Sequence, residues 1–278
     1  MAFTIHATTG QNAYHEVVES VRRHGRRRQS RNGLTLSLDD VTVVLESPKR
    51  ALPLGCGREL STRIAAAEAL QLIGAFSDPE WLVNLAPQFK TYREPTGEFH
   101  GAYGVRVGEQ IAAVVAKLRA DEYTRQAVVT LWNPRLDNDP DKLDYPCTVA
   151  FGFNLAGPTM NTLNMRVTMR SNDVWLGLPY DFFQFAQLQL TICRIMGFDP
   201  GTYVHTAWSM HLYDVNVENT YKLHDWRFDV TEAEQPTGIG RYSDEFPTAI
   251  SRARAIAYGL PLDGELTDSE EWFRAALR

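Results

Sequence analysis

The spacing of apolar positions along the chain predicts several helices. Apolar residues recur at helical spacing or fill Ala- and Leu-rich runs in five segments. These predicted helices cover residues 11–24, 61–76, 109–118, 181–196 and 263–272. The second begins with Ser61 and Thr62, which favour a helix start, and the fourth is stopped by Gly197.

β-branched residues and alternation of apolar and polar positions predict strands between these helices. The predicted strands cover residues 34–45, 126–132, 148–155 and 162–169. The last two are separated by Ala-Gly-Pro-Thr at 156–159, which is typical of a hairpin. Because helices interleave with antiparallel strands, the predicted fold class is α+β.

Length and composition indicate one globular domain. The chain has 278 residues, of which 44% are hydrophobic and 22% charged, and neither a repeat nor a low-complexity linker divides it. We therefore expect a single domain over residues 1–278. No apolar stretch approaches the ~20 residues that span a bilayer, and the first residues lack the order of a signal peptide. We expect no membrane partner and a cytoplasmic location, in the host cell if a phage encodes the protein.

The charge balance and the cysteines exclude several kinds of partner. With 28 basic and 34 acidic residues the net charge is −6, which argues against a stable nucleic-acid partner but leaves small anions open. Cys56, Cys147 and Cys193 are an odd number of cysteines without a CxxC pair. This pattern predicts neither a disulfide framework nor a metal site, and it leaves one cysteine as a candidate reactive thiol.

A local exception to the acidic balance lies near the N-terminus. Six arginines fall within residues 22–31. Most of this cluster is interpreted as a solvated or flexible basic face. The alternative is that Arg31, which is followed by the turn pair Asn32-Gly33, reaches a phosphate.

Cys147 is the candidate nucleophile because of the residues around it. It follows Pro146 at the start of a predicted strand, where its sulfur can face a cleft. Arg170, Ser171 and Asp173 follow the second arm of the predicted hairpin. A guanidinium and a hydroxyl there can hold an oxyanion, and Arg170 can favour the thiolate by lowering the pKa of the thiol. A lone cysteine is more often an inert buried residue.

Two carboxyls and a His-x-Tyr pair each have a functional and a structural interpretation. Glu68 lies on the apolar stripe of its predicted helix, where burial would raise its pKa and suit it to proton transfer; otherwise it is a helix-edge glutamate. Asp181 begins a predicted helix and is a preferred N-cap residue, which needs no further purpose. His211 and Tyr213 share one face of an extended segment as a structural or a binding pair.

These motifs together resemble the thymidylate synthase superfamily. In chain order they are the glutamate helix, Pro-Cys at 146–147, Arg-Ser-x-Asp at 170–173, Gly-x-Pro-x-Asp at 177–181 and His-x-Tyr at 211–213. The resemblance extends from Arg31 to Tyr221. It implies a mixed or antiparallel sheet flanked by helices and a sheet-to-sheet homodimer. It also implies binding of a pyrimidine nucleoside monophosphate and of the folate co-substrate 5,10-methylenetetrahydrofolate, without a metal.

The resemblance implies a role for each matching residue. Cys147 would add to C6 of the base, Glu68 would organise water and move protons, and Tyr103 would take part in proton abstraction. The remaining implied contacts are Arg31, Arg125, Arg170 and Ser171 with the phosphate, His211 and Tyr213 with the sugar, Asn172, Asp173 and Asp181 with the base, and Arg58, Asp173 and Gly177 with the folate. Arg125 would reach the phosphate site of the partner subunit.

Asp181 departs from the synthase pattern and indicates a different base. Synthases carry asparagine there, whose amide both donates and accepts and so matches uracil, whereas an ionised carboxylate only accepts. Cytosine offers its N4 amino group and, when protonated, N3–H. Opposed acceptors with uracil would cost ~1–3 kcal/mol, so Asp181 predicts a cytidylate substrate. A proton held at N3 would also activate C6 for attack by Cys147, which makes Asp181 a candidate catalytic residue.

Thr148 indicates the reaction that follows. Synthases usually carry histidine after the nucleophile, and Cys147-Thr148 with residues 169–173 is similar to the deoxycytidylate hydroxymethylases of bacteriophages. In that branch water completes the reaction, so the resemblance implies a 5-hydroxymethyl nucleotide and tetrahydrofolate. Residues 272–278 also differ from the synthase tail that excludes water from the folate site.

Two other functions stay open. One is a divergent thymidylate synthase that methylates dUMP, and the other is a non-catalytic nucleotide- or RNA-binding protein. The choice between dCMP and CMP is also open, although Ser171 and Arg125 keep the pattern expected for a deoxynucleotide. Arg125 is followed by Gln126, where the family often has a second arginine.

Overall fold

A computed structural model describes residues 2–139, 141–223 and 234–278. Within these residues a mixed eight-stranded sheet has the order β1-β3-β8-β6-β5-β4, with β2 paired to β3 and β7 paired to β8. The strands are β1 (Phe3–Ala7), β2 (Arg26–Ser30), β3 (Gly33–Leu45), β4 (Val128–Thr130), β5 (Thr148–Ala156), β6 (Thr162–Met169), β7 (Asn172–Asp173) and β8 (Asp199–Tyr213). The pairs β1/β3, β6/β8 and β7/β8 are parallel and the others antiparallel.

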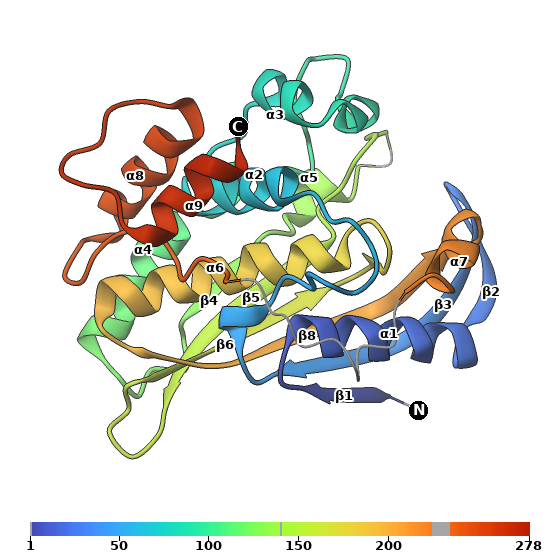
Figure 1. The fold of residues 1–278 in the computed structure, drawn as a ribbon, viewed down its shortest axis with the longest axis horizontal. Helices are drawn as coiled ribbons and strands as arrows, with labels where there is room; N and C mark the ends of the chain where they lie inside the picture. The colour runs from blue at the N-terminus through green and yellow to red at the C-terminus, as the bar shows by residue number, and fades with distance from the viewer. Residues whose placement is uncertain (1, 140, 224–233) are drawn as a thin grey trace.

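The helices lie against this sheet in layers (Figure 1). They are α1 (Gly10–His24), α2 (Thr62–Ile73), α3 (Pro79–Leu85), α4 (Gly104–Ala120), α5 (Pro134–Asp137), α6 (Leu178–Met196), α7 (Asp214–Thr220), α8 (Phe246–Tyr258) and α9 (Asp268–Ala276), with short 3₁₀ helices η1 (Pro48–Arg50) and η2 (Pro87–Tyr92). Figure 1 shows α6 running along the sheet, with α2 and α9 beyond it on the side away from the strands. No helix in the described residues is long and apolar enough to cross a membrane.

Helix α6 forms the middle layer of the core. Its sequence is mostly apolar and even its glutamines are buried, and such a helix is stable only when it is surrounded. Residues from Leu178 to Cys193 are all buried between the sheet and α2. The helix ends at Gly197, which adopts the left-handed conformation with φ 72° and donates its N–H to the carbonyl of Cys193. Because α6 is enclosed along its length, the position of its first turn, which carries Asp181, is fixed relative to the sheet.

Most of the predicted elements are present, and the mixed sheet with flanking helices confirms the predicted fold. Helix α6 begins three residues before the predicted start, because Pro179 occupies the first turn, where proline is favoured. The N-cap interpretation of Asp181 is wrong: Gly177 is the N-cap, and Asp181 lies inside the first turn. The sheet-to-sheet homodimer and the single domain over residues 1–278 stay predictions.

The arginine cluster at residues 22–31 belongs to regular structure rather than to a flexible segment. It covers the end of α1 and the edge strand β2, which pairs with β3 through the Asn32-Gly33 turn. Arg28 forms two hydrogen bonds with the carboxylate of Asp39, and Arg27 lies 3.6 Å from the carboxylate of Asp214. These exposed pairs compensate part of the positive charge of the cluster.

Candidate active site

The directions of three strands bring the predicted site residues to one edge of the sheet. Strands β6 and β8 are parallel and β5 is antiparallel to β6, so the ends of β6 and β8 meet the start of β5. Cys147 immediately precedes β5, and Arg170 immediately follows β6. In the adjacent parallel pair, Asp173 of β7 lies opposite His211 of β8. The edge therefore collects residues that are far apart in the sequence.

Cys147 is a half-buried thiol held beside a guanidinium. Its sulfur lies 3.9 Å from Nη2 of Arg170, whose Nε donates to the carbonyl of Pro146 at 3.0 Å. Burial nevertheless raises the pKa of Cys147 to about 12, because it outweighs the lowering effect of Arg170 and is reinforced by nearby carboxyls. The expectation that Arg170 yields a low-pKa thiolate is wrong for the free site. At neutral pH the thiol holds its proton.

Tyr103 is placed next to this thiol by a backbone contact. The N–H of Thr148 donates to the Tyr103 hydroxyl at 3.1 Å, and the tyrosine ring stacks on Phe185 with centroids 6.1 Å apart. Burial, followed by the neighbouring Cys147 and Asp181, raises the pKa of Tyr103 well above its usual value. Tyr103 therefore stays a neutral phenol that can donate or accept a hydrogen bond beside the nucleophile.

Two carboxyls from helices α2 and α6 have raised pKa values. Burial and then the charge of Asp181 raise the pKa of Glu68, in the middle of α2, to about 8. The raised pKa of Glu68 agrees with the effect expected from burial and argues against the interpretation as a helix-edge glutamate. Burial raises the pKa of Asp181 to about 7, although two hydrogen bonds act in the opposite direction. Both groups can hold or release a proton near neutrality.

Asp181 is buried and its two oxygens have separate partners. Nδ2 of Asn172 donates to Oδ2 of Asp181 at 2.7 Å, and Nε2 of Gln184 donates to Oδ1 at 3.0 Å. Gly177 leaves room for this arrangement, because a Cβ there would lie 3.1 Å from Asp181 Oδ2 and 3.2 Å from Asn172 Nδ2. The carboxyl lies near enough to Cys147 to raise the pKa of its thiol.

The predicted sugar-binding residues form a second group next to the thiol. Nδ1 of His211 lies 3.3 Å from Oγ of Ser171, and the His211 ring meets the Tyr213 ring edge-on with centroids 5.3 Å apart. Asp173 accepts the backbone N–H groups of Trp175 at 2.7 Å and of Leu176 at 3.0 Å. Burial lowers the pKa of His211, so the imidazole is neutral at physiological pH.

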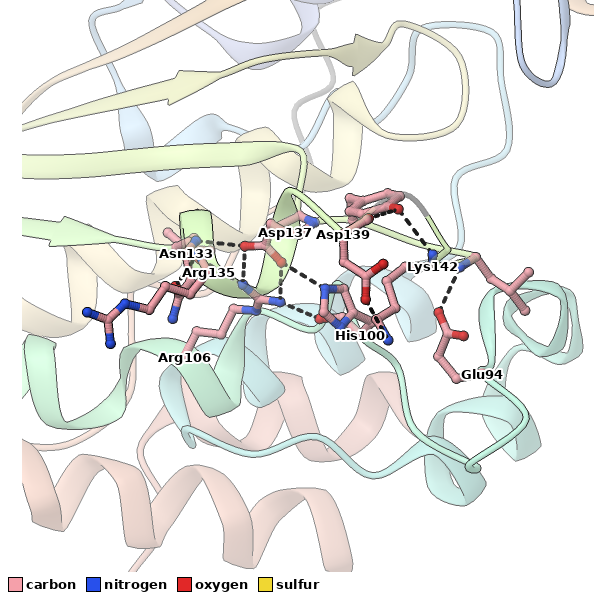
Figure 2. A network of polar contacts seen from close by, with 12 residues as sticks. Glu94, His100, Arg106, Asn133, Arg135, Asp137, Asp139 and Lys142 are labelled. Atoms are coloured by element: carbon pink, nitrogen blue, oxygen red, sulfur yellow. Dashed lines mark hydrogen bonds and ion pairs between the residues drawn. The ribbon is translucent and has the colours of Figure 1, made fainter.

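A buried polar network holds the segment that leads to Cys147 (Figure 2). Asp137 accepts hydrogen bonds from Arg106 at 2.7 and 3.0 Å and contacts Nε2 of His100 at 2.8 Å. Burial alone would raise the pKa of Asp137, but these hydrogen bonds hold it below the usual value. Glu94 accepts the N–H of Leu143 at 2.7 Å, close to the same segment. This network anchors the backbone from which the nucleophile projects.

Three predicted contact residues lie at the margin of this edge. Arg31 is exposed and donates to the carbonyls of Lys142 at 3.3 Å and of Leu143 at 2.8 Å, on the segment before Cys147. Arg58 stacks over the Trp175 ring at 4.0 Å and donates to Oη of Tyr14 at 3.2 Å. Arg125 is exposed just before β4, away from the gathered residues. Its predicted reach into a partner subunit stays a prediction.

The sequence interpretation did not single out three polar residues that support the site. Gln184 holds Asp181, while His205 and Tyr203 continue the hydrogen bonding behind Asn172. The sequence signal that could have identified His205 is a histidine among the apolar residues of a strand face. Among the described residues no group of three His, Cys, Asp or Glu is arranged to hold a metal ion.

A thiol beside a guanidinium, with two proton-holding carboxyls, defines an enzyme site for nucleophilic attack and proton transfer. The chain belongs to the thymidylate synthase family, since a sequence model of that family matches residues 12–227. The resemblance seen in the motifs is thereby confirmed. Enzymes of this family transfer a one-carbon unit to a pyrimidine nucleotide and use methylenetetrahydrofolate as the co-substrate.

The chain is similar in sequence to three curated proteins. It is 27% identical over 269 residues to the deoxyuridylate hydroxymethyltransferase of Pseudomonas phage M6, covering 94% of this chain and 72% of the relative. It is 24% identical over 263 residues to the enzyme of the same name from Bacillus phage SP01, covering 88% and 66%. It is 27% identical over 241 residues to thymidylate synthase 1/2 of Encephalitozoon cuniculi (strain GB-M1), covering 75% and 80%.

Proposed function

We propose that the chain is a cytidylate 5-hydroxymethylase. The reaction joins dCMP, 5,10-methylenetetrahydrofolate and water to give 5-hydroxymethyl-dCMP and tetrahydrofolate, with CMP as the alternative nucleotide. The carrying observation is the buried carboxyl of Asp181, which accepts two amide donors of the protein and lies near enough to Cys147 to raise the pKa of its thiol. The names of the two phage relatives support the hydroxymethyl product.

The hydrogen-bonding pattern at Asp181 favours cytosine over uracil. The ionised carboxylate accepts from the N4 amino group, which only cytosine offers, and from N3 when that nitrogen is protonated. Against uracil the same carboxylate opposes the O4 acceptor, a mismatch worth ~1–3 kcal/mol. Because the pKa of Asp181 is about 7, the carboxyl and the ring nitrogen can share one proton near neutrality.

The surrounding residues then have defined tasks. Cys147 adds its sulfur to C6 of the base, and the electron pair of the C5–C6 double bond shifts through C4 to the protonated N3. Arg170, 3.9 Å from the sulfur, stabilises the thiolate as the proton leaves. Glu68, with its pKa near 8, moves protons to and from water at the exocyclic position. After C5 has taken up the one-carbon unit, its proton is lost beside the neutral phenol of Tyr103 and tetrahydrofolate leaves. Water then adds to the exocyclic methylene, and departure of the Cys147 sulfur from C6 restores the aromatic ring.

The remaining predicted contacts belong to this proposal. Arg31, Arg170, Ser171 and the partner subunit's Arg125 would hold the phosphate, in a homodimer. His211 and Tyr213 would contact the sugar, and Arg58 and Gly177 would lie on the folate side. The neutral state of His211 and its contact with Ser171 suit it to a sugar hydroxyl rather than to an anion.

Hydroxymethylation of deoxyuridylate is the second candidate. The printed names of the two phage relatives favour it. The pKa of Asp181 near 7 also favours it, because a protonated carboxyl can donate to uracil O4 and accept from N3–H. The two functions differ in how their rates depend on the ionisation of Asp181.

Turnover of dCMP, CMP and dUMP with 5,10-methylenetetrahydrofolate tests the proposal. Mass spectrometry of the nucleotide should show addition of one CH₂O unit to dCMP or CMP, together with tetrahydrofolate. Formation of dTMP and dihydrofolate from dUMP alone would make the chain a synthase, and hydroxymethylation of dUMP alone would establish the second candidate. The Cys147→Ala variant is the matched control, since nucleotide binding without turnover separates a catalyst from a binding protein.

A further inference from the structure

Three buried hydrogen bonds connect strand β8 to Asp181. Oη of Tyr203 lies 2.8 Å from Nδ1 of His205, and Nε2 of His205 lies 2.7 Å from Oδ1 of Asn172. Nδ2 of Asn172 then donates to Oδ2 of Asp181 at 2.7 Å. Tyr203 and His205 have no exposed surface, and Asn172 is only 2% exposed. This four-residue chain is therefore shielded from water.

The hydrogen bonds of this four-residue series all run in one direction when Asp181 is ionised. The ionised carboxylate of Asp181 only accepts, so Asn172 must present its NH₂ group there and its carbonyl oxygen to His205. Nε2 of His205 must consequently carry hydrogen, which leaves Nδ1 as the acceptor for the Tyr203 hydroxyl. Burial lowers the pKa of His205 to about 3, so this neutral tautomer persists at physiological pH.

Packing holds the imidazole in the orientation that this direction requires. The Phe182 ring meets the His205 ring edge-on, with centroids 5.2 Å apart and an interplanar angle of 87°. Strand β8 is fixed at the same point, because His205 is paired with Val167 of β6. A histidine so confined can offer Asn172 an acceptor only by moving its hydrogen to Nδ1, which requires the Tyr203 hydroxyl to accept rather than donate.

We propose that Tyr203 and His205 are positioning residues that determine base specificity by locking the amide of Asn172 toward Asp181. This inference rests on the proposed function, in which Asp181 meets the pyrimidine ring. Without the lock, Asn172 can turn its amide and present Oδ1, which suits only a protonated carboxyl. In that state Asp181 is a neutral carboxyl, which no longer opposes uracil O4 with a negative charge. The lock therefore favours cytosine.

Substitution at His205 and Tyr203 tests the lock through substrate preference. The measured quantity is the ratio of kcat/KM for dCMP to kcat/KM for dUMP, which a general loss of stability leaves unchanged. His205→Leu removes both hydrogen bonds and should lower this ratio about tenfold, in proportion to one lost hydrogen bond. Tyr203→Phe removes a single oxygen and should lower it by a smaller factor.

A conservative variant and a remote control complete the experiment. His205→Gln keeps an N–H donor for Asn172 and should restore most of the preference. Tyr258→Phe removes a phenol hydroxyl that contacts Asp78, away from the site, and should leave the ratio unchanged. If His205→Leu does not fold, Tyr203→Phe decides, because it preserves the shape of the side chain. An unchanged ratio in folded Tyr203→Phe and His205→Leu proteins would overturn the positioning role.

Measurements on the wild-type enzyme distinguish a failure of the proposed function from a failure of the lock. If wild type converts only dUMP, the cytidylate function fails whatever the variants do. If wild type prefers dCMP and both variants keep that preference, the function stands and the lock is refuted. Equal losses of kcat/KM for both nucleotides also refute it, because they indicate structural damage without a change in base recognition.

Discussion

Replacing Asp181 by asparagine should exchange the base preference of the enzyme. The amides of Asn172 and Gln184 both donate to position 181. Asp181→Asn therefore puts a new NH₂ group against one of these donors, unless one neighbouring amide turns. Asn172 is held by His205, so Gln184 is the amide that can turn. The new side chain can then both donate and accept, as uracil requires.

The size of the change follows from one mismatched contact on each substrate. With dCMP the variant loses a charge-assisted hydrogen bond to the ionised carboxylate. With dUMP it removes the opposition between the carboxylate and uracil O4. Each of these two changes is worth about 1–3 kcal/mol. Since about 1.4 kcal/mol is a factor of ten, kcat/KM for dCMP should fall and that for dUMP should rise roughly tenfold to a hundredfold.

A competition assay measures this exchange directly. Equal amounts of dCMP and dUMP are converted by wild type, Asp181→Asn and the control Asp39→Asn, which alters an exposed ion pair of β3. Mass spectrometry reports both products in the same sample. A wild-type product ratio in folded Asp181→Asn protein would refute the role of position 181 in base recognition.

Three further predictions concern the proton-holding groups, the nucleophile and the subunit contact. The wild type should lose free energy of unfolding as pH rises from the ordinary glutamate value of 4.5 through about 8, because folded Glu68 keeps a proton that the unfolded chain releases. Glu68→Gln should reduce this loss in urea titrations, and an unchanged pH dependence would contradict its burial. Cys147→Ala should reduce turnover about a thousandfold or more while calorimetry still detects nucleotide binding; substantial residual turnover would exclude Cys147 as the nucleophile. Mixed subunits of Arg125→Glu and Cys147→Ala should regain about a quarter of wild-type activity, since half of the pairs are mixed and each has one intact site. No regained activity after verified subunit exchange would place Arg125 outside the partner's site.

Local signals predicted the central elements of the fold well. The apolar run before Gly197 predicted α6 because a helix enclosed on all sides needs little polar patterning. Strand β2 escaped prediction because the charged residues of Arg26–Ser30 lack strand character and form an edge only by pairing with β3. The length of β8 also escaped, because Pro200 and Gly201 interrupt its pattern while its parallel pairing with β6 joins distant segments.

The residues of the site were easier to predict than their ionisation. Ordered motifs identified Cys147 and Arg170, and their contact agrees with that expectation. The high pKa of the thiol did not follow from the motif, because it depends on burial and on the carboxyls of Asp144, Asp173 and Asp181. His205 was missed for a related reason. A polar residue on a buried strand face becomes informative only when its hydrogen-bond partners are known.

Under the proposed cytidylate function, base recognition and activation of the nucleophile would be coupled through the charge of Asp181. In the free site the carboxylates of Asp181, Asp144 and Asp173 all oppose ionisation of Cys147, and Arg170 alone favours it among the principal charged neighbours. A protonated cytosine ring paired with Asp181 neutralises the first of these carboxylates. The pKa of the thiol then falls when the substrate arrives, and Arg170 gains relative influence. Uracil brings no such proton, so it would leave an ionised Asp181 opposing the thiolate of Cys147. Under the proposed function, selectivity would therefore arise twice from the same carboxyl, once in binding and once in attack.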